Sequence, residues 1–190
     1  SPTLFDNDVQ MQYGSAILLN HRKFVIISVE ILSLPLGLEP RNALCLTIQS
    51  RHTNLTFRAC SIHLDHHETD ERIRLQQANT ILDWYKKDPY YPTILLGDFN
   101  GNQTSTTLTN LYQDFFDDQS LDSSRPTWSE CGEKLKDKID YILLDRRSQW
   151  TIKEFLHGLN MKKLYSSIDI TMLSDHVPLF VKTILRATLK

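Results

Sequence analysis

No segment of this chain says more about its fold than Ile94-Leu95-Leu96-Gly97-Asp98-Phe99-Asn100. An apolar, strand-like run ends abruptly at Gly97, and an Asp and an Asn follow it two residues apart. An Asp at the end of a buried strand is usually a turn former that satisfies nearby backbone amides. It can also be a general base that takes a proton from an attacking water. Composition alone favours the structural role for Asp98, and the catalytic role stays open.

Two further segments place acidic side chains and a His beside apolar runs. Ser174-Asp175-His176-Val177-Pro178-Leu179 opens one run, and Lys138-Ile139-Asp140-Tyr141-Ile142 contains the other Asp. The neighbours of Asp140 predict a strand buried on both faces, where a charge needs a partner. A salt bridge to a Lys or Arg is one explanation. The other is that Asp140 holds one ring nitrogen of His176 while the second nitrogen donates to a phosphoryl oxygen.

His63 ends the strand-like run Phe57–Ile62 and is followed by Leu64-Asp65-His66-His67. His63 and His67 are four residues apart, but His63 ends a strand-like run, so this spacing does not place both rings on one face of a helix as in zinc enzymes. We therefore expect His66 and His67 to be loop residues and His63 to be the functional one.

Length and charge restrict the class of protein. The chain has 190 residues, 41% of them hydrophobic, which predicts a single domain over residues 1–190. Its net charge of −2 provides no basic field for generic nucleic-acid binding. No apolar run is long enough to span a bilayer, and the first residues do not resemble a signal peptide. We expect a soluble protein whose compartment the sequence does not specify.

The three cysteines are odd in number and show no CxxC spacing. We therefore expect neither a disulfide framework nor a zinc site. Cys45 and Cys60 fall within strand-like runs and are expected to be small buried hydrophobic residues.

Apolar periodicity predicts many short strands and few helices. The strand-like runs are Ala16–Leu19, Phe24–Glu30, Leu44–Ile48, Leu55–Leu64, Thr93–Leu96, Ile139–Leu144, Thr151–Phe155 and Val177–Leu185. His52-Thr53-Asn54 is expected to form a hairpin turn. A helix is expected from about Asp70 to Lys87, capped by Thr69, and a shorter one around Ser105–Tyr112. Strands and helices do not alternate cleanly, so the prediction is an α/β (α+β) fold of two packed sheets flanked by helices.

Four motifs together resemble the endonuclease/exonuclease/phosphatase superfamily of magnesium-dependent phosphoesterases. In chain order they are Ile62-His63-Leu64-Asp65, Gly97-Asp98-Phe99-Asn100, Ile139-Asp140-Tyr141-Ile142 and Ser174-Asp175-His176. The resemblance implies a four-layer α/β sandwich with two mainly antiparallel sheets packed face to face. It also implies hydrolysis of a phosphodiester or phosphomonoester with Mg²⁺, or alternatively Mn²⁺, as the cofactor.

The resemblance also assigns roles to the polar residues of these motifs. Asp98 would activate the water, and Asn100 would position the phosphate or a metal-bound water. His63 and His176 would donate to phosphoryl oxygens, and Asp140 would orient His176. The metal ligands that it implies are Asp98, Asn100, Asp175 and His176.

Two family segments have no counterpart in this chain. Family members begin with a strand that carries an Asn, followed by a strand that ends in Gln-Glu, and this Glu is the principal magnesium ligand. Here the first family-like segment is Tyr13-Gly14-Ser15-Ala16, and residue 1 is not Met. We therefore expect an N-terminal segment or a separate chain to complete the sheet. Without it, a sheet edge and apolar surface should be exposed.

The substrate stays open between a nucleic acid, a phosphoinositide, a sphingolipid and a small nucleotide. The net charge of −2 argues against tight generic DNA binding. Trp128, in the expected loop before the Asp140 strand, would either contact the substrate or pack in the core. The competing hypothesis for the whole chain is a catalytically inactive remnant of the same fold that acts as a binding module.

Overall fold

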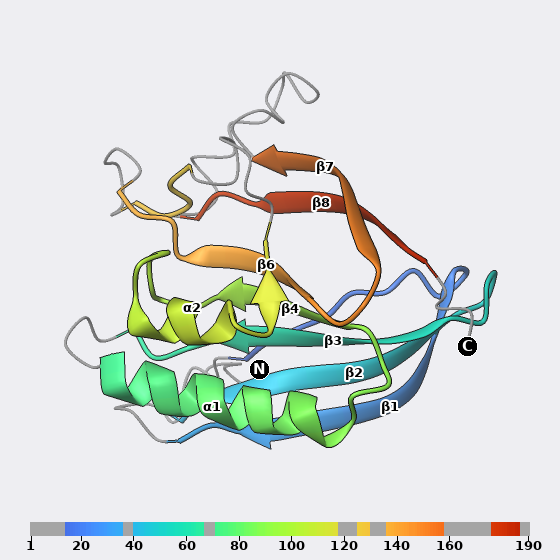
Figure 1. Cartoon of the computed structure of the whole chain (residues 1–190), viewed down its shortest axis with the longest axis horizontal. Coiled ribbons are helices and arrows are strands. Elements are labelled where there is room, and N and C mark those ends of the chain that lie inside the picture. The colour runs from blue at the N-terminus through green and yellow to red at the C-terminus, as the bar shows by residue number, and fades with distance from the viewer. Residues whose placement is uncertain are drawn as a thin grey trace, which may run out of the picture.

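The computed structural model describes residues 14–35, 40–66, 71–117, 125–129, 136–157 and 176–186. The elements follow in the order β1 (Phe24–Ser33), β2 (Asn42–Ser50), β3 (Thr56–His63), α1 (Glu71–Lys87), β4 (Thr93–Asp98), α2 (Thr106–Leu111), β5 (Phe115–Phe116), β6 (Asp140–Asp145), β7 (Trp150–His157) and β8 (Leu179–Leu185). One sheet has the order β1-β2-β3-β4-β6-β5, and β7 pairs with β8 in a second (Figure 1). Every pair except β3 with β4 is antiparallel. The predicted α/β fold with two mainly antiparallel sheets is confirmed.

Both predicted helices are present, and they cover one face of the larger sheet (Figure 1). Glu71 in the first turn of α1 and Lys86 and Lys87 in the last turn complement the helix dipole. The expected cap Thr69 lies outside the described residues. α2 begins after Ser105, whose side chain accepts a hydrogen bond from the Leu108 amide at 3.2 Å. The buried stripes of both helices form one core with the inward side chains of β2, β3, β4 and β6.

The opposite face of the larger sheet carries a second apolar cluster around Leu46, Ile48 and Ala59. Phe57 from β3 meets Trp150 from β7 edge to face, with ring centroids 6.5 Å apart, so the second sheet approaches this face. The strand predicted at Ala16–Leu19 is wrong. These residues alternate in exposure and pack against the cluster, but they have no strand partner within the described part of the chain. An alternating pattern reports which side chains are buried, whereas a strand also needs a neighbouring backbone.

β1 forms an edge of the larger sheet and exposes several apolar side chains. Ile26, Val29 and Ile31 are 49%, 57% and 71% exposed, respectively. The register pairs them with Ile48, Leu46 and Leu44 of β2, so they share the face that carries the second apolar cluster. The structure therefore has the exposed sheet edge and apolar surface that the sequence led us to expect.

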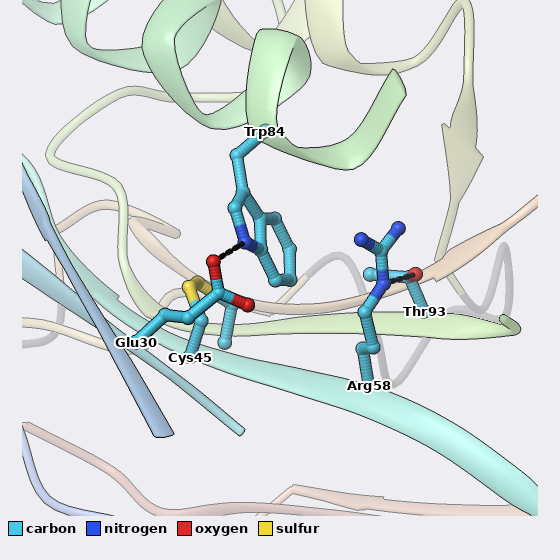
Figure 2. The surroundings of a disulfide bond; sticks show 6 residues. Glu30, Cys45, Arg58, Trp84 and Thr93 are labelled. Atoms are coloured by element: carbon cyan, nitrogen blue, oxygen red, sulfur yellow. Dashed lines mark hydrogen bonds between the residues drawn. A yellow bond between two sulfur atoms is a disulfide. The ribbon is translucent and has the colours of Figure 1, made fainter. Parts of the chain in front are cut away.

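The hairpin between β2 and β3 corrects the prediction for the cysteines. The turn predicted at His52-Thr53-Asn54 is present, and its register places Cys45 opposite Cys60, with their Cα atoms 4.1 Å apart. Both side chains are buried, as expected, but they form a disulfide bond rather than standing as separate thiols. Figure 2 shows the bond beneath Trp84 of α1, whose ring nitrogen donates to Glu30 at 3.2 Å. The disulfide thus ties the hairpin together on the side that faces the helix.

Candidate active site

Three neighbouring strands bring three of the predicted residues to one end of the larger sheet. β3 and β4 run in parallel, and their last residues, His63 and Asp98, are register partners. β6 runs antiparallel to β4 and begins at Asp140, the register partner of Asp98. Residues far apart in the sequence therefore become neighbours through strand pairing.

His176 joins this group from the segment before β8. Its Nδ1 lies 2.9 Å from Asp140 Oδ2, which is hydrogen-bonding distance. Its Nε2 lies 3.9 Å from Asp98 Oδ2, and His63 Nε2 lies 3.7 Å from the same oxygen. Two imidazoles thus flank one carboxylate oxygen, and a second carboxylate holds one of the two rings.

The chain turns sharply after Asp98. Gly97 before it and Asn100 two residues after it have backbone conformations that suit this turn. Gly97 has a φ of 133°, a conformation that strongly favours glycine. Asn100 has a φ of 47°; its amide donates to Asp98 Oδ1 at 2.7 Å, and its Nδ2 donates to the Leu64 carbonyl at 3.0 Å. Asp98 therefore caps the turn with one oxygen and presents the other to the imidazoles. A structural role for Asp98 in the turn and a role as general base are therefore compatible.

Burial and neighbouring charges perturb the acid–base behaviour of the site. Burial, with a smaller contribution from the Asp140 carboxylate, raises the pKa of Asp98 to about 6. The His63 ring is half-exposed, and its partial burial together with the cations at Arg41 and His176 lowers its pKa to about 4. At neutral pH the protein therefore holds Asp98 mainly ionised and His63 neutral.

A cleft of about 830 Å³ opens over these residues. Of the predicted site residues, His63, Asp98, Asn100 and His176 line it. Asp140 does not line the cleft itself, but it is hydrogen-bonded to His176, which does. Asp175 lies outside the described residues, as does His67.

Several residues that line the cleft were not among the predicted site residues. Trp128 lines the cleft, which favours contact with a ligand over a place in the core. His66 is an exposed loop residue, as expected, and its Nδ1 accepts a hydrogen bond from Arg41 Nη2 at 2.9 Å. Glu71 and Arg74 enter the cleft from the start of α1. Their sequence signal was the position of α1 directly after the His63 strand.

The residues of the site fit a divalent cation. Asp98, Asp140 and His176 each offer a ligand atom, and these atoms lie within 4.8 Å of one another. Carboxylate oxygens are the ligands that Mg²⁺ prefers, and a cation would relieve the repulsion between the two carboxylates. His176 differs from the other two because its Nδ1 is already bound to Asp140.

A buried polar network supports the turn that carries Asp98 and Asn100. The Tyr141 hydroxyl lies 3.1 Å from the Gly101 carbonyl and 3.0 Å from the Lys138 carbonyl. Lys138 Nζ pairs with Asp117 Oδ2 at 2.7 Å, and both side chains are buried. The loop beyond Asp98 is therefore held from below by β6.

Glu71 connects the two helices at the rim of the cleft. Its Oε1 accepts a hydrogen bond from the Thr107 amide at 2.7 Å, and its Oε2 accepts from Arg74 Nη2 at 3.0 Å. Partial burial opposes ionisation, but these two donors outweigh it and lower the pKa of Glu71. The ionised carboxylate thus stabilises the contact between α1 and α2.

Glu71→Gln is expected to lower the free energy of unfolding by about 1 kcal/mol at pH 7, a modest value because the side chain is 33% exposed. The pKa of Glu71 is lower in the folded protein than in the unfolded chain. Its contribution is therefore complete above the ordinary pKa of a glutamate, and it is lost as the pH falls through the folded-state pKa. Urea unfolding at several pH values should show the difference between the two proteins shrinking in acid.

Glu154→Gln, at an exposed position of β7, is the matched control for this experiment and should behave as the unmutated protein. A Glu71→Gln difference that does not change between neutral and acidic pH would contradict the linkage to ionisation.

The chain thus has a mixed α/β fold of two sheets, with a polar cleft at one end of the larger sheet. The model of the Endonuclease/Exonuclease/phosphatase family matches residues 3–176, and the chain belongs to this family. A comparison with curated proteins gives no match.

Several solved structures share the fold. A functionally unknown conserved protein from Enterococcus faecalis has 24% sequence identity and a TM-score of 0.71, over 88% of this chain and 69% of its own. The mannosyl-6-phosphatase of Bacteroides thetaiotaomicron has 18% identity and a TM-score of 0.68, over 86% of this chain and 68% of its own. D. rerio TDP2, complexed with a single-strand DNA product, has 17% identity and a TM-score of 0.68, over 86% and 69%.

Within the described residues, no helix is both long and apolar enough to cross a membrane.

Proposed function

We propose that this protein is a divalent-metal-dependent phosphoesterase that hydrolyses a phosphodiester or phosphomonoester through a water activated by Asp98. The observation that supports this most is the position of Asp98 Oδ2 in the cleft, 3.7 Å from His63 Nε2 and 3.9 Å from His176 Nε2. Phosphoryl transfer depends mainly on positioning and on electrostatic stabilisation of the phosphoryl oxygens. The Asp98 carboxylate would position the attacking water, and the two imidazoles beside it would stabilise the phosphoryl oxygens.

Asp98 acts as the general base in this proposal. Its Oδ1 accepts the Asn100 amide at 2.7 Å, which fixes the direction of Oδ2. The attacking water gives a proton to Oδ2 as its oxygen bonds to phosphorus, while the bond from phosphorus to the leaving oxygen breaks and that oxygen departs with the bonding electron pair. Fixing the acceptor in advance saves the cost of orienting it during the reaction.

The two histidines donate to the phosphoryl oxygens in different protonation states. Asp140 accepts the Nδ1–H of His176 at 2.9 Å, and it stabilises the imidazolium that forms when Nε2 also carries a proton. His63, with its pKa lowered to about 4, remains neutral and offers a single N–H. The pair would therefore provide one charged and one neutral donor at the transition state.

Asp98, with Asn100 and Asp175, is proposed to hold the divalent cation. His176, which the family resemblance also suggested as a ligand, is assigned to the phosphoryl group because Asp140 already holds its Nδ1. A cation bound there would polarise the phosphate and stabilise the leaving oxygen.

The test is hydrolysis of bis(p-nitrophenyl) phosphate and p-nitrophenyl phosphate by the purified protein with Mg²⁺ or Mn²⁺. We expect turnover of at least one ester, its loss on chelation, and its recovery when the metal is restored. His176→Ala should abolish most of the turnover and would exclude a contaminating enzyme. No turnover, or turnover that chelation does not affect, would overturn the proposal and favour an inactive binding module.

A panel of natural esters would then identify the substrate. Two solved structures with the same fold are named for a sugar phosphatase and for a complex with single-strand DNA. The panel therefore contains mannose 6-phosphate and single-stranded DNA, together with a nucleotide, an inositol phosphate and sphingomyelin. The ester with the highest kcat/KM identifies the class.

A further inference from the structure

Thr127 lies where three segments that are distant in the sequence meet. It is fully buried, at 0% exposure, in the segment 125–129 that crosses the start of β6 and the residues before β8. The next residue, Trp128, lines the cleft and forms backbone bridges with both Asp137 and His176. A change at Thr127 can therefore affect the cleft without touching a bound ligand.

The side chain of Thr127 binds the backbone of the segment that carries Asp140. Its Oγ1 accepts hydrogen bonds from the amides of Ile139 and Asp140, each at 3.1 Å. These two amides lie at the start of β6, where an N–H that is shielded from water needs an acceptor. The hydroxyl oxygen is the side-chain atom of Thr127 that can accept a hydrogen bond from both amides.

The main chain of Thr127 binds the segment that carries His176. Its carbonyl accepts the Val177 amide at 2.7 Å, while its own amide donates to the Asp137 carbonyl at 2.8 Å. Val177 directly follows His176, whose Nδ1 lies 2.9 Å from Asp140 Oδ2. The hydrogen bonds close a circuit that runs from the Thr127 hydroxyl through Asp140, His176 and Val177 to the Thr127 carbonyl.

We propose that Thr127 is a positioning residue that sets the distance between Asp140 and His176 and hence the direction of His176 Nε2. The inference rests on the proposed function, because it matters only if His176 acts on the substrate. Without the hydroxyl, the Asp140 amide loses its direct hydrogen bond to the segment that anchors Val177, although the backbone hydrogen bond from Thr127 to Asp137 remains. His176 then keeps its own anchor while its carboxylate partner shifts.

The test compares Thr127→Val, which keeps the shape and removes the hydroxyl, with Thr127→Ser, which keeps the hydroxyl. Thr127→Val is expected to lower kcat by roughly 10- to 100-fold with little change in KM, since small misplacements of a catalytic group have effects of this order. Thr127→Ser should recover most of the loss. A purely structural role would instead lower the melting temperature and leave kcat of the folded protein unchanged.

A double-mutant cycle separates positioning of His176 from other effects. In the His176→Ala background, Thr127→Val should cost little further activity, because the ring that it positions is absent. A full additional loss in that background would overturn the inference, as would a Thr127→Val variant with the kcat of the unmutated protein.

Amide hydrogen exchange provides a readout that needs no activity. In Thr127→Val, the Ile139 and Asp140 amides should exchange about tenfold faster, as expected for a lost hydrogen bond. The Val177 amide, which donates to the retained backbone carbonyl, serves as the internal control and should keep its protection. Unchanged exchange at Asp140 would contradict the proposed tie. Absence of turnover by the unmutated protein would end both proposals, whereas normal turnover by Thr127→Val would end only this one.

Discussion

Asp98→Asn should lower kcat by a factor on the order of 10²–10⁴, the usual contribution of a positioned general base. The amide has the shape of the carboxylate, and its oxygen can still accept the Asn100 amide that now donates to Oδ1 at 2.7 Å. The turn is therefore retained, but the group can no longer take a proton from water. Steady-state kinetics with saturating Mg²⁺ on the best ester of the panel measures the change.

The matched control is Asp114→Asn. Asp114 pairs with Lys86 at 3.2 Å and does not line the cleft, so its kcat should stay near that of the unmutated protein. Circular dichroism and thermal unfolding should show that both variants remain folded. Asp98→Asn with kcat close to that of Asp114→Asn would remove Asp98 from the mechanism.

Gly97→Ala is expected to be the most destabilising single substitution near the site. A Cβ at this position would lie 2.0 Å from the Ile62 carbonyl oxygen, which is backbone of the adjacent strand β3 and cannot rotate away. The φ of 133° is a second, independent obstacle for any residue with a side chain. Two such mechanisms together predict a loss of roughly 4 kcal/mol or more. For a chain of this size, that corresponds to a fall in melting temperature of about 10 °C or more.

Gly14→Ala is the matched control because a Cβ there meets no atom within 4 Å. Urea unfolding of the two variants beside the unmutated protein measures the difference. A common unfolding midpoint for both variants would show that the strands can separate at Gly97 without cost.

Most of the strands could be predicted because their signals are local. The apolar runs around Thr93–Leu96 and Ile139–Leu144 correspond to β4 and β6, with ends shifted by a few residues. Leu55–Leu64 likewise corresponds to β3. The run Ala16–Leu19 failed because Ile17 and Leu19 are partly buried although no neighbouring strand pairs with them among the described residues, and no local pattern reports a missing partner.

The cysteine pair was predictable in principle. The turn at His52-Thr53-Asn54 was expected, and counting outward from it along both strands places Cys45 within one residue of the position opposite Cys60. The observed register, which pairs Gln49 with Thr56, makes the two cysteines direct partners. The odd number of cysteines and the absence of a CxxC spacing led to the opposite expectation. In a hairpin, the register is set by the turn, so the turn is better evidence for a pairing than the cysteine count.

The sequence by itself determined which chemical groups stand at the ends of the strands, because strand length and turn residues are local properties of the chain. It predicted His63, Asp98, Asn100, Asp140 and His176 as site residues, but it presented Asp98 as either a turn former or a base. Only the tertiary structure shows that Asp98 accepts the Asn100 amide with Oδ1 while Oδ2 lies near the two imidazoles. It alone brought Thr127 to Asp140 and Val177. Separations of 2.9 to 3.9 Å between the site's side chains depend on strand register and on loops that cross between sheets. These are long-range pairings, which no short segment of sequence contains.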